Sequence, residues 1–424
     1  MDDLFFSTTD AKGVITDSNE VFERLARYSR DELIGSAHNI IRHPDMPGGV
    51  FRAMWDTLEA GEPFVGYVRN LAKGDSSYDV LATVTPLPDG GYLSVRMRPS
   101  TDTYATAASV YYEMNDLEHW VCNNEGKNRR EAAAIGVGRL QEELDKLGIP
   151  DYRHLMNVML PAEVAAREAQ SSIDIAALGS RNEVAQAVVA VYRALDDFMN
   201  TQDSLARTVA ALRAASAQLD EDTSTTARVA QEMDNLDIDG PEATLLLAPL
   251  KVWAGMRSIV AEYIGDLEEM LASLQALSEQ SRFFIALARL HALMTALFAA
   301  DEADRQESIG MLVKVLEAGT EKMRHLVAEH QRVSRRVSVK SGSVVSLLEV
   351  PREMIDTWLQ STVTSSLADG AEELIAQARQ AIEKSDSSMA QLSELGQAVN
   401  EQQTLEFDQL QDAVHYLSGL VAGA

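Results

Sequence analysis

The pattern of hydrophobic and polar positions divides the chain into two parts of different character. Over about the first hundred residues, short β-branched and aromatic runs alternate with turns rich in Gly, Asp and Pro. From Thr103 onward these signals almost disappear, and Ala, Leu, Glu, Gln and Arg dominate, which is typical of helices. The sequence therefore predicts a small α+β domain followed by a large all-α region.

The first part predicts a hairpin, two short helices, a connector, a longer helix and three further strands. Asn19 caps the first helix, which runs to Arg27, and Ser29 to Glu32 has the spacing of a capping box at the start of the second. The predicted strands are Leu4–Thr8, Val14–Thr16, Phe64–Leu71, Ser77–Pro86 and Tyr92–Arg98.

A polar segment from His38 to Pro47, called here the connector, precedes the longer helix. Pro44 and Pro47 restrict the backbone, so an irregular and rigid segment is expected. Pro47 suits the first position of a helix whose apolar face carries Phe51, Met54, Trp55 and Leu58. Donors beside an aromatic wall would suit a planar ligand with polar edges. The polar groups would equally serve only to cap the two flanking helices.

The second part predicts amphipathic helices with narrow apolar seams, which must be buried against other helices in the same chain or in a partner. One seam is Met256, Val260, Tyr263, Leu267, Met270, Leu274 and Leu277, and a shorter one is Leu205, Val209, Leu212 and Leu219. Helix breaks are expected at Asn123–Gly126, Gly148–Pro150, Gly240–Pro241, Ser341–Ser343, Pro351 and Gly370, with a helix end or frayed turn at Asp220–Thr226. The predicted domains are residues 1–100, connecting helices 101–150 and a helical bundle 151–424.

Charge and composition narrow the class of protein. The formal net charge of −28 argues against binding to nucleic acid or to anionic membranes. With one cysteine, Cys122, no disulfide can form within the chain. The acidic N-terminus does not resemble a secretory signal, and the longest apolar run, Phe283–Ala300, contains Arg289 and His291, so we interpret it as a buried helix. We expect a soluble, cytoplasmic protein.

The connector and the residues after it resemble the PAS domain of Aer-type aerotaxis receptors. The resemblance covers residues 4 to 98 approximately and is carried by Asn39-Ile40-Ile41-Arg42-His43-Pro44-Asp45-Met46-Pro47, Phe51, Met54-Trp55, Thr57-Leu58, Gly61-Glu62-Pro63, Gly66 and Asn70, with Ser7-Thr8-Thr9-Asp10 and Asn19 earlier. It implies a five-stranded antiparallel sheet that encloses a ligand beneath short helices. In that family the ligand is FAD, whose redox state reports on oxygen or electron transport.

Carried over residue by residue, the resemblance places seven residues at the cofactor. They are Asn19, Asn39, Arg42, His43, Asp45 and Trp55 in or beside the flavin cleft, with Asn70 on the opposite strand. The chemistry agrees, because Trp55 can stack on a ring system while Arg42 and the Asn amides can meet carbonyls or phosphates. His43 would either donate to the cofactor or cap the following helix.

The sequence also departs from the family pattern. Phe64 and Asp79 stand where the family usually has Trp, and the turn at Leu71–Asp75 is less basic than usual. These changes leave three possibilities open: weaker FAD binding, a simpler ligand, or no ligand.

The helical region only faintly resembles the cytoplasmic part of chemoreceptors, since the Glu-Ala-Ala-Arg-Ala-Gly-Glu type tip is absent from the sequence. Kinase, cyclase and nucleophile-elbow motifs are absent too, so we expect a sensor without enzymatic activity that acts on a protein partner. We also expect self-association through the helices and signalling from the PAS domain through Thr103–Glu118. The alternatives are a haem-binding gas sensor with His43 as axial ligand, and a scaffold that senses nothing.

Overall fold

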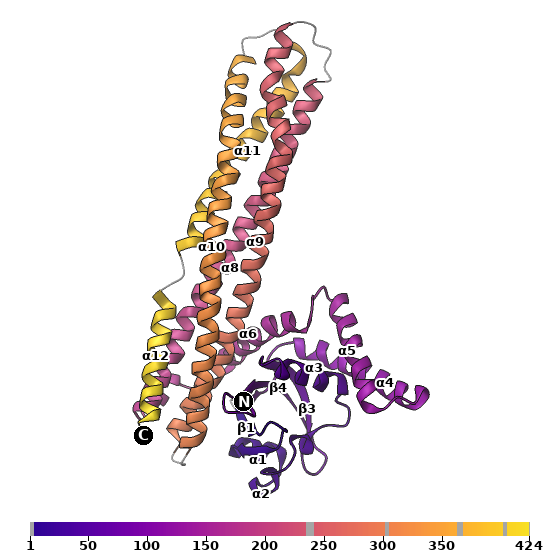
Figure 1. Cartoon of the computed structure of the whole chain (residues 1–424), viewed down its shortest axis with the longest axis vertical. Helices are drawn as coiled ribbons and strands as arrows, with labels where there is room; N and C mark the ends of the chain where they lie inside the picture. The colour runs from indigo at the N-terminus through magenta and orange to yellow at the C-terminus, as the bar shows by residue number, and fades with distance from the viewer. Residues whose placement is uncertain (1–3, 235–240, 302–304, 363–367, 402–404, 424) are drawn as a thin grey trace. The chain divides into compact units, whose positions relative to one another are not determined.

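The computed structural model describes residues 4–234, 241–301, 305–362, 368–401 and 405–423 (Figure 1). The chain forms two compact units. The first comprises Met1–Met199, Glu279–Arg324 and Leu405–Ala424, and the second comprises Asn200–Ser278 and His325–Thr404. The long helices α8 (Glu183–Asp234), α9 (Pro241–Ala300) and α10 (Gln306–Thr362) each contribute to both units, so the units are defined by packing and not by position along the sequence.

The N-terminal domain is built on a five-stranded antiparallel sheet with the strand order β2-β1-β5-β4-β3. Its strands are β1 (Phe5–Thr9), β2 (Ile15–Ser18), β3 (Phe64–Leu71), β4 (Ser77–Pro86) and β5 (Tyr92–Met97). The predicted five-stranded antiparallel sheet is therefore confirmed. Phe64–Leu71 and Ser77–Pro86 are confirmed at both ends, and the strand predicted at Tyr92–Arg98 ends one residue earlier, at Met97.

Short helices cover one face of this sheet: α1 (Glu20–Ala26), α2 (Arg30–Leu33), the 3₁₀ turn η1 (His38–Ile41) and α3 (Gly48–Glu59). The Asn19 side chain accepts the N–H of Phe22 at the start of α1, and the capping box predicted at Ser29 forms at the start of α2. Pro47 is the N-cap of α3 and not its first helical residue, so the helix begins at Gly48, one residue later than expected. The Pro47 side chain has no acceptor for the free N–H groups of the helix.

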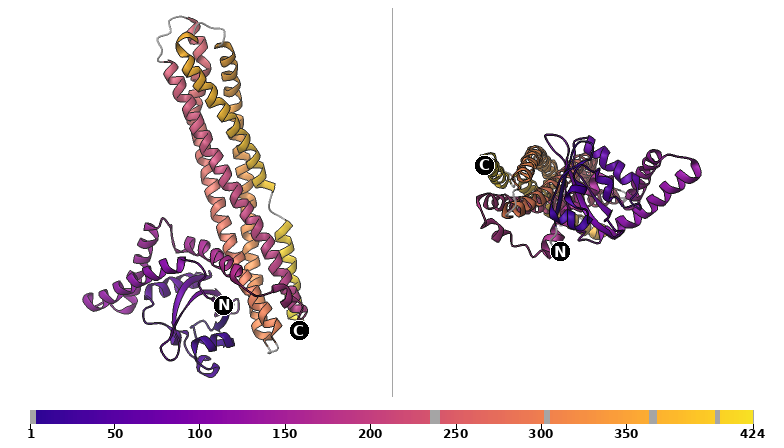
Figure 2. Two further views of the ribbon diagram at one scale, coloured as in Figure 1. Left: turned by 180° about the vertical axis from the view of Figure 1, so that it is seen from behind. Right: turned by 90° about the horizontal axis from the view of Figure 1, so that it is seen from below.

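Four helices follow the sheet in the same unit: α4 (Thr103–Glu125), α5 (Arg129–Lys146), α6 (Tyr152–Gln170) and α7 (Ile175–Gly179). Helix α5 packs against both α3 and α4, and α6 packs against β3 (Figure 2). The predicted helix at Thr103–Glu118 is thus part of α4. It does not continue directly from β5, because Pro99 lies in the connection between them.

A buried carboxylate of α6 fixes that connection. The Glu163 side chain is fully buried and accepts hydrogen bonds from the backbone N–H groups of Ser100 and Thr101, at 2.6 and 3.2 Å, and from the hydroxyl of Thr101 at 2.6 Å. It also accepts the hydroxyl of Tyr67 on β3 at 2.7 Å. Burial and this carboxylate together raise the pKa of Tyr67.

The remaining helices are α8 (Glu183–Asp234), α9 (Pro241–Ala300), α10 (Gln306–Thr362), α11 (Ala368–Glu401) and α12 (Leu405–Ala422). In the second unit, parts of α8, α9, α10 and α11 lie side by side around one apolar core (Figures 1 and 2). Both predicted seams contribute to this core, for example Leu212 of α8 and Leu267 of α9. The chain thus buries its own seams, and no second copy is needed to cover them.

Several predicted breaks are wrong. Ser341–Ser343 and Pro351 lie inside α10, Asp220–Thr226 inside α8, and Gly370 inside α11. Ser and Gly each weaken a helix by at most about 1 kcal/mol, and Pro by about 3 kcal/mol. Burial of apolar neighbours such as Leu348 and Ile355 outweighs these costs in α10. Gly240 lies outside the described residues, while Pro241 begins α9.

The apolar run Phe283–Ala300 is buried, as predicted. Within the part of the chain that the structure describes, one stretch, Lys251–Ala300, is long and apolar enough to cross a membrane by length and composition. Its most apolar window has a mean hydropathy of 1.8, but 89% of that window is buried inside the protein. The core helix of a soluble protein has the same properties.

Candidate functional site

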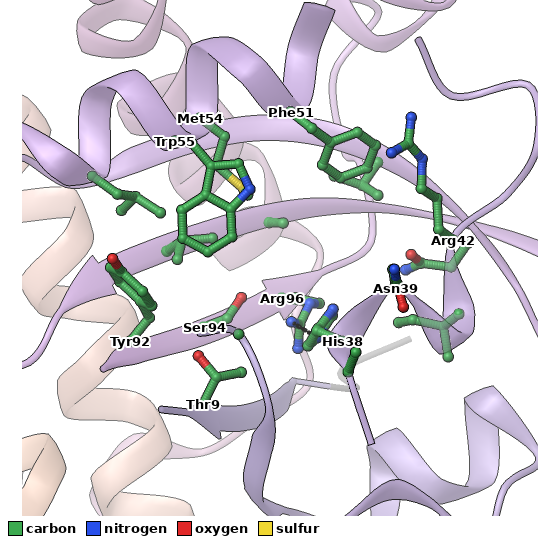
Figure 3. A pocket seen from close by; sticks show the side chains of 18 of the residues that line it. Thr9, His38, Asn39, Arg42, Phe51, Met54, Trp55, Tyr92, Ser94 and Arg96 are labelled. Carbon is green, nitrogen blue, oxygen red and sulfur yellow. Dashed lines mark hydrogen bonds between the residues drawn. The ribbon is translucent and has the colours of Figure 1, made fainter. Parts of the chain in front are cut away.

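A cavity of about 270 Å³ lies between α3, the connector and the helix-covered face of the sheet (Figure 3). Its wall on α3 is apolar, and its wall on the strands is mixed. The lining residues on α3 are Phe51, Met54, Trp55 and Leu58, and those on β3, β4 and β5 are Val68, Asn70, Ala82, Val84, Tyr92, Ser94 and Arg96.

The apolar wall is held in place by contacts between aromatic rings and cations. The Trp55 ring packs edge-on against Tyr92, with 5.4 Å between ring centroids. The Arg42 guanidinium lies 4.2 Å from the centroid of the Phe51 ring and donates to the carbonyl oxygen of Met46 at 3.0 Å. These contacts fix the side chains of α3 relative to the connector.

Arg96 supplies a buried positive charge at the opposite wall. Its guanidinium donates to the Ser7 hydroxyl at 3.0 Å and lies 2.5 Å from Nε2 of His38. Arg96 is only 4% exposed, and a buried charge usually has a partner of opposite charge. None of the ion pairs among the described residues includes Arg96. Burial lowers its pKa to about 10, so the group stays protonated at neutral pH. Burial and the Arg96 charge lower the pKa of His38 well below its usual value, which leaves a neutral imidazole that accepts from Arg96.

Asn70 adds an unsatisfied donor. Its side chain is 3% exposed and lines the cavity, and its Nδ2 has no hydrogen-bond partner among the described residues. A buried polar group without a partner costs about 1–3 kcal/mol, and a bound acceptor would remove that cost. The cavity therefore combines an aromatic wall with buried donors that have unused capacity.

Four of the seven predicted site residues line the cavity. They are Asn39, Arg42, Trp55 and Asn70. The other three, Asn19, His43 and Asp45, do not belong to its lining.

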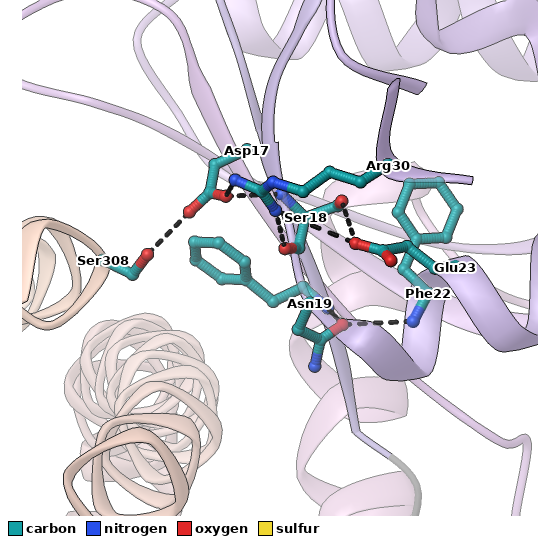
Figure 4. A network of polar contacts seen from close by, with 8 residues as sticks. Asp17, Ser18, Asn19, Phe22, Glu23, Arg30 and Ser308 are labelled. Atoms are coloured by element: carbon teal, nitrogen blue, oxygen red, sulfur yellow. Dashed lines mark hydrogen bonds and ion pairs between the residues drawn. The ribbon is translucent and has the colours of Figure 1, made fainter. Parts of the chain in front are cut away.

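Asn19 instead joins β1 to α1 (Figure 4). Its side-chain oxygen accepts the N–H groups of Phe6 and Phe22, at 3.1 and 3.2 Å, and its amide donates to the Leu4 carbonyl at 3.2 Å. Next to it, Asp17 pairs with Arg30 at 2.7 Å. Asn19 therefore has a structural role, because its side chain holds β1 and the start of α1 together.

His43 and Asp45 interact with each other. Nδ1 of His43 accepts the backbone N–H of Asp45 at 3.2 Å, and the Asp45 side chain is 70% exposed. These contacts lie within the connector, so among the described residues His43 does not cap α3, which is one of the two roles predicted for it.

Tyr92, Ser94 and Arg96 of β5 line the cavity, as does His38, although none of the four is predicted from the sequence as a site residue. The period of two along β5 carries a signal for the first three, because they alternate with the buried apolar residues Leu93, Val95 and Met97. A charged residue on the inner face of such a strand is unusual and indicates a site.

Two of the three departures from the family pattern, Phe64 and Asp79, lie away from the cavity. Phe64 stacks on Tyr152 of α6, with 5.4 Å between ring centroids. Asp79 pairs with Arg69 of β3 at 2.8 Å, and Arg69 also donates to the hydroxyl of Tyr104. Neither Phe64 nor Asp79 is a lining residue, so their replacement of Trp leaves the cavity wall unchanged.

Comparison with known proteins places the N-terminal domain in a family. Residues 15–96 match the family described as the PAS fold. The chain is 38% identical over 118 residues to the aerotaxis receptor of Escherichia coli, covering 27% of this chain and 23% of the receptor. It is 33% identical over 82 residues to the biofilm dispersion protein BdlA of Pseudomonas aeruginosa, covering 19% of this chain and 20% of that protein. The chain therefore spans about a quarter or less of the length of these relatives.

Three further proteins show some similarity to this chain. The nitrogen fixation regulatory protein of Klebsiella pneumoniae is 31% identical over 81 residues, which is 19% of this chain and 16% of that protein. Among solved structures, a PAS domain from Colwellia psychrerythraea is 23% identical, with a TM-score of 0.20 over 22% of this chain and 85% of its own. The LOV protein of Rhodobacter sphaeroides is 16% identical, with a TM-score of 0.22 over 33% and 88%. TM-scores this low say nothing about the ligand of this chain. The curated relatives are thus named as a receptor, a biofilm dispersion protein and a regulatory protein.

Proposed function

Because residues 15–96 form a PAS domain homologous to that of an aerotaxis receptor, we propose that this protein is a redox sensor whose cavity binds a flavin, FAD. The observation that carries the proposal is the cavity lining, in which the Trp55 wall faces the buried donors of Asn70 and Arg96. A flavin has a planar ring system with acceptor atoms along its edge, which is the shape and polarity that this lining fits.

The residues of the cavity would hold such a group in distinct ways. Trp55 and Phe51 provide the apolar surface for a ring system, and the Asn70 amide and the Arg96 guanidinium provide donors. The cavity volume of about 270 Å³ is near the lower end of small-molecule sites, so it suits the ring system and not the whole of FAD. Lys12, an exposed lining residue, would meet a phosphate outside the cavity. The bound flavin would supply reversible oxidation and reduction.

An absorption spectrum of the freshly purified full chain tests the ligand. We expect flavin bands, with FAD released on denaturation and identified by chromatography. A Soret band would instead indicate haem, and protein absorbance alone, persisting after incubation with FAD, FMN or riboflavin, would contradict the proposal. Haem is disfavoured because His43 is outside the lining and Nε2 of His38 is engaged by Arg96.

A matched pair of variants tests the donor set. Asn70→Ala removes the unsatisfied buried donor, and we expect flavin affinity to fall about tenfold, since one hydrogen bond in a buried site is worth roughly 1.5 kcal/mol. Asn124→Ala removes the same amide from an exposed position on α4 and should leave the affinity unchanged. Equal affinities for the two variants would show that Asn70 is not a ligand contact.

We further propose that the sensor acts by binding a protein partner and that it self-associates. Since the seams of the second unit are buried within the chain, self-association must use other surfaces. Light scattering on the full chain checks this proposal, and a monomer at all concentrations would contradict it.

A further inference from the structure

Helix α3 is shared between the cavity and the helices that follow the sheet. One face of α3 lines the cavity with Phe51 and Trp55, while the helix also packs against α5 (Figures 1 and 2). A shift of α3 in response to a ligand would therefore change both the cavity wall and the packing against α5. The contact at the N-terminus of α3 determines how such a shift is passed on.

A carboxylate from α4 binds this N-terminus. Glu118 is 8% exposed, and its two oxygens accept the backbone N–H groups of Gly48 and Gly49 at 2.6 and 2.8 Å. Because Pro47 cannot cap the helix with its side chain, Glu118 provides the cap from 70 residues away. A negative charge at this end also interacts favourably with the helix dipole.

Glycines allow the three helices to approach closely at this point. A Cβ atom on Gly49 would lie 2.8 Å from the carbonyl carbon of Gly136 on α5, and a Cβ on Gly136 would lie 2.2 Å from Oε1 of Glu118. The backbones of α3 and α5 and the carboxylate of α4 are therefore in direct contact. Closely packed helices move in discrete steps and do not deform gradually, so α3 cannot shift here without its neighbours.

We propose that Glu118 is a positioning residue that couples the state of the cavity to the α4–α5 hairpin, so that a change of ligand state at Trp55 reaches α5 through the N-terminus of α3. The proposal rests on the proposed function in one respect, because it takes the flavin and its reduction as the change of state. It also gives a physical route to the predicted signalling segment, of which Glu118 is the last residue. Coupling of this kind changes equilibria about 5- to 150-fold.

The test compares full-length variants by hydrogen exchange in α5 (Arg129–Lys146), with the flavin oxidised and then chemically reduced. In the wild type we expect the two states to differ at least fivefold in exchange rate at α5. Glu118→Ala should bring the two states to within twofold while the flavin spectrum is retained. A residue that only stabilised α3 would raise exchange equally in both states, so the difference between states separates coupling from a structural role.

Two further variants keep the test decisive if Glu118→Ala does not fold. Glu118→Gln keeps an acceptor for one N–H, and we expect an intermediate difference between states. Glu125→Gln removes the same charge from an exposed position at the end of α4 and should behave as the wild type. A full difference between states in either Glu118 variant, or no difference in the flavin-bound wild type, would overturn the proposal.

A second arm needs no flavin. If the wild type binds none, the proposed function fails, but Trp55→Ala still changes the cavity wall on α3. We expect this substitution to alter α5 exchange at least fivefold when Glu118 is present and less than twofold with Glu118→Ala. Equal effects of Trp55→Ala in both backgrounds would overturn the coupling by itself.

Discussion

The PAS domain and the second helical unit bury their polar groups in opposite ways. In the PAS domain, Asn70, Ser94 and Arg96 converge on one cavity of about 270 Å³. In the second unit, buried hydroxyls such as that of Thr223, which donates to the Asp220 carbonyl of its own helix at 3.0 Å, are dispersed along helices in an otherwise apolar core. Convergent donors around a space indicate a ligand, whereas dispersed hydroxyls can bond within their own helix. We therefore place the proposed ligand in the PAS domain and not in the second unit.

The largest expected effect is on the cavity of the PAS domain and spares the second unit. Trp55→Ala removes the aromatic wall, and we expect nearly complete loss of bound flavin while the helices of the second unit stay folded, because the two regions have separate cores. Flavin absorbance and circular dichroism check both statements. Trp120→Ala, at an exposed position on α4, is the matched control. Unaltered flavin content in Trp55→Ala would mean that the site lies elsewhere.

The PAS fold could be predicted closely because its signals are local. Strand alternation, Gly-containing turns and the Asn19 cap each act within a few residues. The connector motif likewise identifies Arg42 and Trp55 as lining residues. The roles of Arg96 and Glu118 depend on partners 58 and 70 residues away, His38 and Gly48, which no local pattern reveals.

The breaks predicted in the helical region fail for a related reason. Ser341 and Pro351 are unfavourable in a helix by local preference, yet both are buried within α10. Packing of the apolar residues of α10 outweighs such preferences, and the two seams predicted from the sequence, in α8 and α9, are buried in the same core. The sequence thus predicts which residues of the second unit are buried better than it predicts where its helices end.

A core substitution in the second unit is expected to lower its stability without affecting the cavity. Leu267 is fully buried, so Leu267→Ala should lower the free energy of unfolding by about 2–5 kcal/mol while leaving flavin content unchanged. Denaturant unfolding and the flavin spectrum measure the two effects. Val339→Ala, at a side chain that is 71% exposed, should change stability by less than about 0.5 kcal/mol. Loss of flavin in Leu267→Ala would contradict the separation of the two cores.

The stability of the second unit is expected to depend on pH through a buried histidine, His330. Burial lowers the pKa of His330 to about 4 from 6.5, so between these values the unfolded chain binds a proton more readily than the folded one. Stability is therefore lost as pH falls from 6.5 to 4, by at most about 3 kcal/mol. His330→Leu should flatten this pH dependence, and His325→Leu, an exposed position on the same helix, should not. An identical pH profile in wild type and His330→Leu would contradict the argument.

The smallest effect tests whether the family departure at Asp79 matters for the ligand. Asp79 and Arg69 form a pair on the outer face of the sheet, with side chains 28% and 43% exposed, and the cavity lies on the other face. Partly exposed ion pairs contribute about 0–1 kcal/mol, so Asp79→Ala should lower the free energy of unfolding by no more than that and leave flavin affinity unchanged. Titration of flavin into both proteins, together with denaturant unfolding, measures the two quantities. Arg69→Ala is the matched control, because it removes the same pair from the other side and should give the same small loss. If Asp79→Ala weakened flavin binding tenfold and Arg69→Ala did not, Asp79 would act on the cavity directly, and the distinction between the two faces of the sheet would fail.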